Sequence, residues 1–517
     1  MKNRKGLIAI IVIFLLCIAG LLWPGKEKEI VPPQLNDFCS SIHNTDTTKL
    51  STELLPFQKL LDTKTGVYVL EDGGGSLLTR AWFCEHAEKT IDVQYFIFST
   101  DNVGLIATDY LVRAADRGVQ VRIIVDDIMV EAGIHEILTI DSHKNISIKI
   151  YNPGVNLGKN IFQKIGKLAT NFRSVNQRMH NKIFAVDGKI AITGGRNVAD
   201  EYFDYDHEYN FRDRDVLLMG KAVKAMETSF ETFWNSPLSV PVNQLVEEKD
   251  NTFSDENRFE RLHQYACNPE NFWPQLREQI QNLPAVFHEI IKSGGVVWTD
   301  SAFFVTDLPG KNDGTKGLKG GSITTSELIS LITQAKHSID IQSPYLITTE
   351  VGQKLFKDAV ARGVRIRILT NSLASTDNTE AFAGYQKNRK DLLRTGVEIY
   401  EFRPDAAERV KMATGALQKK LNYTPVFGLH AKSMVVDGTI TVIGTFNLDP
   451  RSANLNTECF AVIHSRQIAQ SVLKGMEEEY KPENSWRTTL DFNPDSYVSK
   501  TKRVKTFAKK IIPKEIL

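Results

Sequence analysis

Apolar and polar positions follow the same order twice along the chain. Residues 91–98 alternate apolar and polar side chains, and residues 119–125 form a β-branched run after a helical stretch. Residues 339–346 and 364–369 repeat this arrangement, again with a helical stretch between them. A strand, a crossover helix and a strand of this length indicate a βαβ unit in a largely parallel sheet covered by helices. The pattern therefore predicts an α/β fold made of two similar halves.

Short similar sequence segments at corresponding places support a duplication. Arg117-Gly-Val-Gln-Val corresponds to Arg362-Gly-Val-Arg-Ile, and Thr90-Ile-Asp-Val corresponds to Ser338-Ile-Asp-Ile. The chain has 517 residues, more than one hydrophobic core usually organises. We divide it into two halves, residues 63–235 and 301–490, joined by a helical or irregular connector at residues 236–300. Before them we expect a membrane anchor at residues 1–25 and a spacer at 26–62, and after them a basic tail at 491–517.

The N-terminus is typical of a membrane anchor. Lys2, Arg4 and Lys5 precede an uncharged run at residues 6–23, close to the roughly 20 residues that a spanning helix needs. Positive charge before the run and balanced charge after it predict a single-pass membrane protein with the rest of the chain outside the cytoplasm. A cleaved signal peptide is the alternative, although the apolar run continues beyond any cut after Ala19.

Composition narrows the classes of function. The formal net charge is +1, which gives no global attraction to nucleic acid, so any basic surface has to be local. The five cysteines show neither metal-site spacing nor the density of a disulfide scaffold. Two disulfides remain open for the four cysteines after Cys17, but we expect buried free thiols.

A second repeated sequence motif contains the residues that could take part in a reaction. Each copy holds a histidine, a lysine, an aspartate and an asparagine at the same spacing, namely His180, Lys182, Asp187 and Asn197 in the first copy and His430, Lys432, Asp437 and Asn447 in the second. An isolated histidine on a strand is usually a packed or surface residue. Two copies of the whole set instead indicate one site built from both halves.

Strand geometry explains the spacing. Residues two apart in a strand share a face, so His180 and Lys182 project together. The following Asp-Gly is a hairpin-turn signature, and the returning strand brings the asparagine back to the same end. We expect the two aspartates to form the turns and to orient the loop and the lysine, without acting on substrate.

Two such sets facing each other suit a phosphodiester. The lysines and asparagines would donate hydrogen bonds to its non-bridging oxygens, most strongly as charge grows in the transition state. One neutral histidine would attack phosphorus to form a phosphohistidine, and the other, protonated, would give its proton to the leaving oxygen. We expect no metal and no cofactor, because His-x-Lys is poor ligand spacing and no acidic cluster accompanies it.

Each histidine needs a carboxylate partner, because a carboxylate bound to the ring nitrogen that does not react holds the imidazole in one tautomer. Glu458 is the candidate within the second half. In the first half Asp213 and Asp215 occupy a comparable place, and we prefer Asp213. A surface ion pair is the alternative for all three.

With these motifs the chain resembles the phospholipase D superfamily, whose hallmark is His-x-Lys-x4-Asp in two copies. Within it the chain is most similar to bacterial cardiolipin synthases of the C type, through Asp92-Val-Gln-Tyr-Phe, Ser343-Pro-Tyr and Gly444-Thr-Phe-Asn. The resemblance implies two α/β/α sandwiches related by a pseudo-twofold axis, with the active site at their interface. It also implies that His180 is the nucleophile and His430 the acid and base.

The resemblance implies a phosphatidyltransferase of the bacterial inner membrane that makes cardiolipin from phosphatidylglycerol and a second phospholipid. The alternatives are a phospholipase D that releases phosphatidate, a nuclease of the same superfamily, and a membrane scaffold with a degenerate site. A nuclease is disfavoured by the anchor and the missing net basic charge, and the intact motifs argue against a scaffold. Nucleic acid is therefore not expected as a partner.

Two basic amphipathic segments support a lipid substrate independently. Residues 156–178 and 500–514 both combine lysines and arginines with apolar positions at helical spacing. Such segments suit an anionic membrane surface. A solvated helix packed on the body is the alternative for each.

Overall fold

The structure is a computed structural model, and it describes residues 49–127, 134–153, 176–206, 208–245, 257–272, 276–277, 280, 283–312, 320–409 and 425–517. The predicted anchor, Cys17, Cys39 and residues 156–175 of the first basic segment lie outside the described residues. Within the described ranges, no helix combines the length and the apolar character needed to cross a membrane. All described residues belong to the compact unit Asp37–Leu517.

The first half is organised around a nine-stranded sheet in the order β10-β1-β8-β6-β5-β2-β3-β4-β9. Its strands are β1 (Thr65–Leu70), β2 (Thr90–Tyr95), β3 (Gln120–Asp126), β4 (Ile146–Tyr151), β5 (Ile183–Val186), β6 (Ile190–Gly194), β8 (Asp215–Gly220), β9 (Ser239–Pro241) and β10 (Val297–Thr299). The described helices of this part are α3 (Leu50–Leu54), α4 (Gln58–Thr63), α5 (Gly73–His86), α6 (Asn102–Asp116), α7 (Ile134–Asp141), α10 (Val223–Trp234), α11 (Arg258–Ala266) and α13 (Val286–Lys292).

The second half is organised around an eight-stranded sheet in the order β11-β18-β17-β16-β12-β13-β14-β19. Its strands are β11 (Ala302–Thr306), β12 (Ser338–Gln342), β13 (Arg365–Asn371), β14 (Glu398–Phe402), β16 (Ser433–Val436), β17 (Ile440–Gly444), β18 (Cys459–His464) and β19 (Ser485–Thr488). The described helices here are α14 (Ile323–Gln334), α15 (Glu350–Ala361), α16 (Thr379–Arg394), α18 (Pro450–Asn454), α19 (Arg466–Glu479) and α20 (Lys500–Ala508). Apart from β10, the two sheets have the same strand order, which confirms the duplication.

The predicted βαβ units are present in both halves. β2 and β3 pair in parallel around α6, and β12 and β13 pair in parallel around α15. Each helix ends at an arginine followed by a glycine with positive φ, which is 100° at Gly118 and 90° at Gly363. This left-handed conformation favours glycine and ends the helix.

The prediction of largely parallel sheets is wrong. Parallel pairing is confined to β2–β3–β4 and β12–β13–β14 among the described pairs of the two sheets, and the remaining pairs are antiparallel. The physical reason is the pair of hairpins after the motifs. Asp187 and Gly188 have φ of 52° and 65°, and Asp437 and Gly438 have φ of 52° and 60°, so each turn reverses the chain into an antiparallel neighbour.

The connector is also more ordered than expected. β9 pairs with β4, and β10 pairs with β1, so residues 236–300 add strands to the first sheet. α13 packs on α5, where the rings of Phe287 and Trp82 stack with centroids 4.7 Å apart. Cys267, which follows α11, is disulfide-bonded, contrary to the expected free thiol, whereas Cys84 and Cys459 are free and buried.

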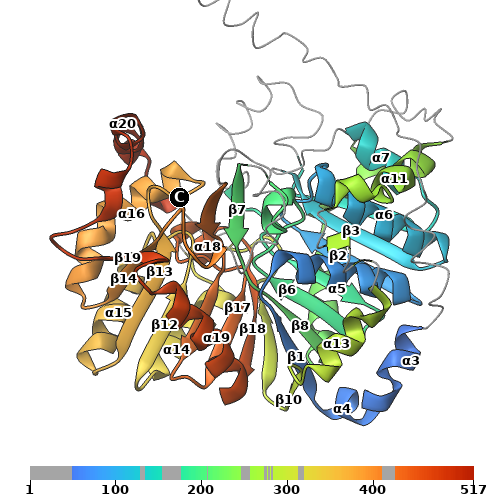
Figure 1. The fold of residues 1–517 in the computed structure, drawn as a ribbon, viewed down its shortest axis with the longest axis horizontal. Helices are drawn as coiled ribbons and strands as arrows, with labels where there is room; N and C mark the ends of the chain where they lie inside the picture. Colours follow the sequence, from blue (N-terminus) through green and yellow to red (C-terminus); the bar gives the residue numbers. More distant parts are fainter. Residues whose placement is uncertain are drawn as a thin grey trace, which may run out of the picture. The chain divides into compact units, whose positions relative to one another are not determined.

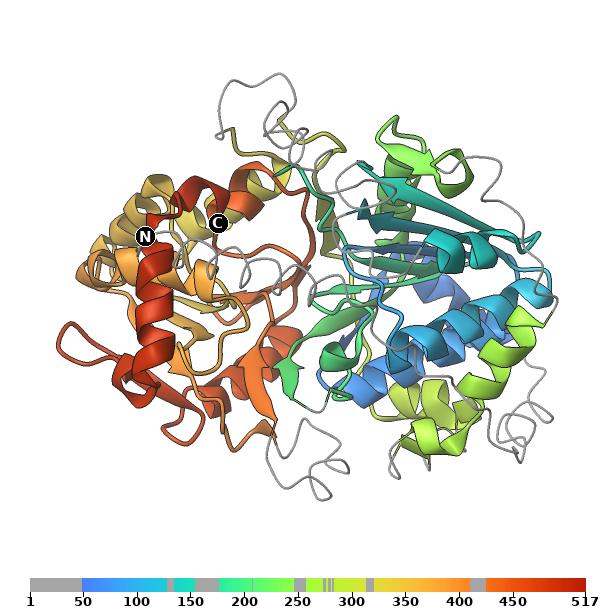
Figure 2. The same ribbon diagram turned by 90° about the horizontal axis from the view of Figure 1, so that it is seen from above.

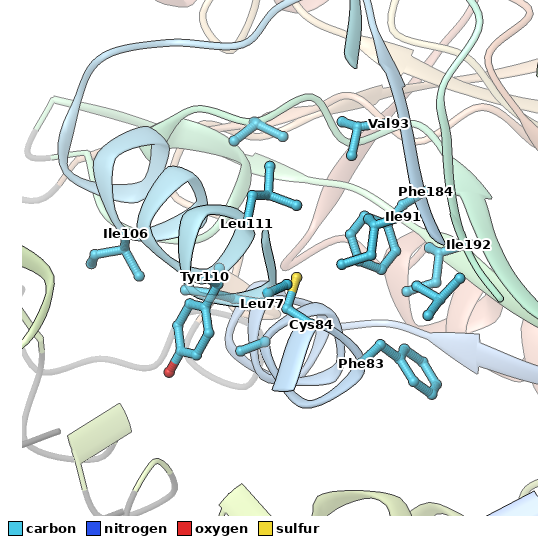
Figure 3. Packing of buried hydrophobic residues seen from close by; sticks show 14 of the residues in the cluster. Leu77, Phe83, Cys84, Ile91, Val93, Ile106, Tyr110, Leu111, Phe184 and Ile192 are labelled. Atoms are coloured by element: carbon cyan, nitrogen blue, oxygen red, sulfur yellow. The ribbon is translucent and has the colours of Figure 1, made fainter. Parts of the chain in front are cut away.

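Four apolar clusters stabilise the described part of the chain, and three of them are large. One lies in the first half between its sheet and α5 and α6, and Figure 3 shows Leu77 and Cys84 packing towards Tyr110 and Leu111. A second fills the equivalent region of the other half. The third joins side chains of both halves, such as Val216 and Ile443. The two halves lie side by side in Figures 1 and 2.

A short parallel ladder also joins the halves. β7 (Tyr209–Arg212) of the first half pairs with β15 (Val426–Leu429) of the second. Each of these strands leads directly to a predicted site residue, because Asp213 follows β7 and His430 follows β15. The ladder therefore fixes the position of a carboxylate from one half beside a histidine from the other.

Candidate active site between the two halves

Both motifs lie in extended segments that enter a strand. His180 and Lys182 come immediately before β5, and His430 and Lys432 come immediately before β16, so they are not within the strands as predicted. The backbone still places each lysine beside its histidine, since Lys182 Nζ donates to the carbonyl oxygen of His180 over 3.1 Å. All four side chains are buried.

Backbone contacts bring the two motifs to one interface. The amide of His180 donates to the carbonyl of Thr457 in the second half over 3.0 Å, and the amide of His430 donates to the carbonyl of Arg212 in the first half over 2.8 Å. Each motif is thus anchored on the opposite half. The predicted assembly of one site from both copies agrees with this geometry.

The histidines and carboxylates pair crosswise. His180 Nδ1 lies 2.8 Å from Glu458 Oε2, and His430 Nδ1 lies 2.6 Å from Asp213 Oδ2. The expected pairing of Glu458 with the second-half histidine and of Asp213 with the first-half histidine is therefore wrong. The physical reason is that each carboxylate follows backbone that pairs with the other half, because Asp213 follows β7 and Glu458 follows Thr457, which bridges to Met179.

Asp213 and Glu458 occupy equivalent places in the two halves. The amide of Gly195 donates to Arg214 and the amide of Thr445 donates to Cys459, one residue after each carboxylate. A Cβ atom on Gly195 would lie 2.0 Å from Asp213 Oδ1, so glycine is required there. In the second half the Thr445 hydroxyl instead donates to Glu458 Oε2.

Asp215 has a structural role that separates it from Asp213. Its Oδ2 atom accepts hydrogen bonds from Ser76 Oγ and from an Arg80 guanidinium nitrogen, each over 2.9 Å. The Arg196 guanidinium lies 3.4 Å from the same oxygen. Asp215 is thus held within the first half, which leaves Asp213 as the carboxylate at the imidazole.

The motif aspartates act on the backbone at the other end of their hairpin strands. Asp187 accepts the amides of Glu88, Lys89 and Thr90 over 2.7–2.9 Å. Asp437 accepts the amides of residues 336–338 in the same way. They hold the turn against the start of β2 or β12, so they do not orient the lysines directly and do not belong with the groups around the histidines.

The motif asparagines differ in their contacts. Asn197 Oδ1 accepts the amide of Ile97 over 3.2 Å. Asn447 Oδ1 is buried, and among the described residues it has no hydrogen-bond partner. The backbone keeps Asn447 close to its lysine, since Gly444 N donates to Lys432 O over 3.2 Å. A buried amide oxygen without a partner is costly, which is typical of a group that meets a ligand.

Burial controls the charge of the site. It lowers the pKa of His180 to about 4, with Lys182 acting in the same direction and Glu458 against it. It lowers the pKa of His430 to about 3, with Lys432 adding to the effect and Asp213 opposing it. Both imidazoles are therefore neutral at neutral pH.

The lysines and carboxylates complete this picture. Burial lowers the pKa of Lys182 to about 8 and that of Lys432 to about 7, although Glu458 and Asp213 favour their charged forms. Burial opposes the charge of Asp213, but His430 and Lys432 outweigh it and hold the pKa well below its usual range. Two poorly compensated cationic groups at one place make a site for an anion.

Several residues around the histidines were missed by the sequence analysis. Phe96 packs edge-on against His180, with ring centroids 5.1 Å apart, and Tyr202 and Phe211 pack against His430 at 5.0 and 4.7 Å. Ser452 Oγ donates to Glu458 Oε1 over 2.7 Å. Thr445 lies in the segment Gly444-Thr-Phe-Asn, so its hydroxyl was visible in the sequence.

Arg178 also departs from its predicted role. We expected it on a membrane-facing helix, but its guanidinium is buried and lies 3.1 Å from Asp126 Oδ1. Its position two residues before His180 explains this, because the motif itself is buried between the halves. Arg178 therefore stabilises the backbone that leads into the first motif.

Two neutral imidazoles, each supported by a carboxylate from the opposite half and flanked by a lysine, define a two-histidine phosphodiester transferase of the phospholipase D type. The family model described as "Cardiolipin synthase, PLD-like domain" matches residues 83–234 and 328–480, once in each half. Because these matches cover more than half of the chain, the protein belongs to this cardiolipin synthase-type, phospholipase D-like family.

Individual relatives agree with this assignment. Cardiolipin synthase C of Escherichia coli K12 is 32% identical over 446 residues, which are 86% of this chain and 90% of that protein. An uncharacterized protein of Helicobacter pylori J99 is 32% identical over 82% of this chain and 80% of its own length. The crystal structure of phosphatidylserine synthase from Haemophilus influenzae matches 89% of this chain and 99% of its own with a TM-score of 0.56 at 15% identity, which shows a common fold.

Proposed function

We propose that this protein is a membrane-associated phosphatidyltransferase that makes cardiolipin from phosphatidylglycerol and a second phospholipid. The observation that carries the proposal is the crosswise pairing of His180 with Glu458 and of His430 with Asp213. It leaves one Nε2 atom on each imidazole for chemistry, as a double-displacement reaction at phosphorus needs. The similarity to Cardiolipin synthase C supports the choice of substrate.

The proposed reaction has two steps. His180 attacks phosphorus of phosphatidylglycerol, the bond to the glycerol oxygen breaks, and His430 gives its proton to that oxygen. A hydroxyl of the second phospholipid then attacks the phosphatidyl-histidine, His430 takes the hydroxyl proton, and His180 is released. Lys182, Lys432 and the asparagines donate to the non-bridging oxygens throughout.

Binding of the anionic substrate explains how His430 can become protonated. In the empty site Lys432 Nζ lies 3.1 Å from His430 Nε2, which disfavours protonation of the ring. A bound phosphodiester draws the ammonium towards its oxygens and adds a negative charge beside the imidazole. Both effects raise the pKa of His430, so that the ring can carry the proton for the leaving oxygen.

The C-terminal helix supports a membrane location. α20 packs on α16, and Lys509 Nζ lies 2.7 Å from Glu380, at the edge of the second half in Figure 1. Apolar side chains of α20 and of the turn Lys509–Ile511 after it nevertheless point outwards, because Val504, Phe507 and Ile511 are 68%, 69% and 88% exposed. A helix that only packs on the body would bury these side chains.

The location of the catalytic body is part of the proposal. The uncharged run at residues 6–23 would anchor the chain in the inner membrane with the body outside the cytoplasm. The disulfide at Cys267 supports this side, because disulfides persist in oxidising compartments.

The proposed reaction is tested by incubating the purified protein with phosphatidylglycerol and identifying the products by mass spectrometry. We expect cardiolipin and free glycerol. His180→Ala and His430→Ala should each lower turnover by at least about 10²- to 10⁴-fold, and the double variant should be little worse than either. The exposed His464 provides a matched control, since His464→Ala should stay active. Phosphatidate without cardiolipin would contradict the transferase and favour a hydrolase.

A further inference from the structure

A large apolar cavity opens beside the second motif. It has a volume of about 450 Å³ and lies between α14, α15 and α18, within the range of small-molecule sites. The exposed surface of its lining is mainly apolar, with side chains such as Ile329, Leu355 and Phe446, and its charged lining residues are Lys514, Glu350, Asp449 and Glu515. No catalytic step described above uses this space.

The large cavity shares part of its wall with a smaller cavity at the second motif. A smaller cavity of about 30 Å³ is lined by Lys432 and Gly444, and it shares four lining residues with the large one, namely Leu328, Ile332, Phe446 and Leu448. Phe446 and Leu448 flank Asn447, whose buried amide oxygen has no partner in the described part of the chain. Apolar side chains next to the phosphate-binding groups therefore also line the large cavity.

Among its described residues, the first half has no cavity of this size at the equivalent place. α5 and α14 are equivalent, because their C-caps Ala87 and Ala335 both lie three residues before the following strand. The equivalent region between α5 and α6 contains only about 30 Å³. Figure 3 shows Leu77, Cys84 and Tyr110 filling it.

Two replacements explain the difference. Arg80 corresponds to Leu328, and in the first half its guanidinium bonds to Asp215 and lies 5.7 Å from the ring centroid of Phe203. Phe203 in turn corresponds to Ala453, six residues after the motif asparagine in both copies. A buried ion pair and a phenyl ring thus occupy one half, whereas aliphatic side chains and an alanine leave the other open.

We propose that the cavity between α14, α15 and α18 binds an acyl chain of the phospholipid whose phosphodiester is held by the two histidines. This inference rests on the proposed function and adds to it a direction of binding, with the lipid tail directed into the second half. An aliphatic chain matches the apolar part of the lining. The filled first half offers no second site of this kind among the described residues.

The test fills the cavity of the second half with large side chains, as the equivalent place in the first half is filled. Ala453→Phe introduces the ring that closes the equivalent space, and Leu355→Trp fills the cavity from α15. Ser326→Phe is the matched control, because it adds the same ring to α14 at an exposed position. Thermal unfolding of each variant shows which of them are folded.

Activity is compared on dioleoyl- and dibutyryl-phosphatidylglycerol in the same detergent micelles. In a folded Ala453→Phe or Leu355→Trp variant, kcat/KM on the dioleoyl lipid should fall by about tenfold or more, given the hydrophobic contribution of each buried methylene. Activity on the dibutyryl lipid should change less than about twofold, and Ser326→Phe should behave as the wild type. An unchanged ratio of the two activities in both folded variants would overturn the acyl-chain site.

A second measurement separates this inference from the proposed function. Dodecyl phosphate and ethyl phosphate are compared as inhibitors of bis(p-nitrophenyl) phosphate cleavage, which requires no lipid transfer. The wild-type protein should be inhibited more strongly by dodecyl phosphate, and Ala453→Phe should lose this preference. If no cardiolipin forms but the preference is found and lost in this way, the proposed transferase fails and the acyl-chain site stands. Equal inhibition by both compounds in the wild type would reject the site.

Discussion

His430 Nδ1 lies 2.6 Å from Oδ2 of Asp213, a carboxylate that belongs to the opposite half of the chain. The second pair repeats the exchange, with His180 Nδ1 2.8 Å from Glu458 Oε2. Each half therefore supplies one histidine and the support for the other. A duplicated chain of this kind forms a complete site only when both halves are folded and docked.

Crosswise pairing predicts which carboxylate supports which chemical step. Asp213→Asn should impair His430, the acid, and Glu458→Gln should impair His180, the nucleophile. A p-nitrophenyl phosphodiester needs little acid catalysis, because nitrophenolate leaves without a proton. Asp213→Asn should therefore lose much less activity on this substrate than on a lipid diester, whereas Glu458→Gln should lose about the same on both.

The measurement is the ratio of kcat/KM on the two substrates in each variant. His430→Ala is the matched control, and it should show the same selective recovery as Asp213→Asn. The opposite result, with recovery in Glu458→Gln alone, would support pairing within each half.

The nucleophile can be identified by trapping the intermediate. His430→Ala lacks the base for the second step, so the phosphohistidine formed from a nitrophenyl diester should accumulate on His180. Quenching in alkaline denaturant preserves a phosphohistidine, and peptide mass spectrometry locates it. Label on His430 in the wild-type protein, with none on His180, would reverse the two roles while keeping the mechanism.

The local parts of this fold and site could be predicted from the sequence. The strand and helix pattern gave both βαβ units, and the repeated words identified His180 and His430. The sheet direction was mistaken because the strands after the hairpins join their neighbours in antiparallel fashion, and hydrophobic periodicity does not encode direction. The crosswise pairing of Asp213 depends on how the halves dock, and that depends on many long-range contacts such as β7–β15.

Binding of an anion should take up protons. Burial lowers the pKa of Lys182 to about 8 and of Lys432 to about 7 in the empty site, so both lysines lose protons as pH rises through this range. A bound phosphodiester favours the charged lysines and raises their pKa. The affinity for diethyl phosphate, whose own charge is constant, should therefore fall as pH increases from about 7, by up to about tenfold per pH unit for each lysine.

Isothermal titration in buffers of different ionisation heat measures this proton uptake directly. Lys432→Met should reduce the number of protons taken up and flatten the pH dependence. An affinity that stays constant from about pH 6 to about pH 9 would show that the lysines are fully charged without ligand.

Lys432 should also lower the free energy of unfolding. The pKa of Lys432 is lower in the folded protein, at about 7, than the usual 10.5, so its charge destabilises the fold fully below pH 7 and less as pH rises towards 10.5. Lys432→Met should therefore raise the free energy of unfolding by roughly 2–4 kcal/mol near neutral pH while abolishing turnover. The gain in Tm should shrink between neutral and strongly alkaline pH, and a gain that grows over this range would contradict the sign.

α20 allows a test of membrane contact that leaves the active site intact. Val504 and Phe507 of α20 and Ile511 of the turn after it are exposed on the outer face, whereas Thr506 is buried. Deleting the whole tail would also remove Lys514 from the wall of the large cavity. Substitution of the exposed side chains is therefore the cleaner experiment.

In a chain starting at Asp37, the first residue of the compact unit, Phe507→Ser combined with Ile511→Ser should weaken binding to vesicles of anionic phospholipid. The loss follows from two large side chains that no longer enter the lipid, each contributing about 1.5–3 kcal/mol when fully buried. Lys505→Gln should instead reduce mainly the salt-sensitive part of binding, by about 1 kcal/mol. Cleavage of bis(p-nitrophenyl) phosphate should stay unchanged in both variants. Vesicle binding equal to that of the unsubstituted chain at low salt would show that α20 is only a solvated helix.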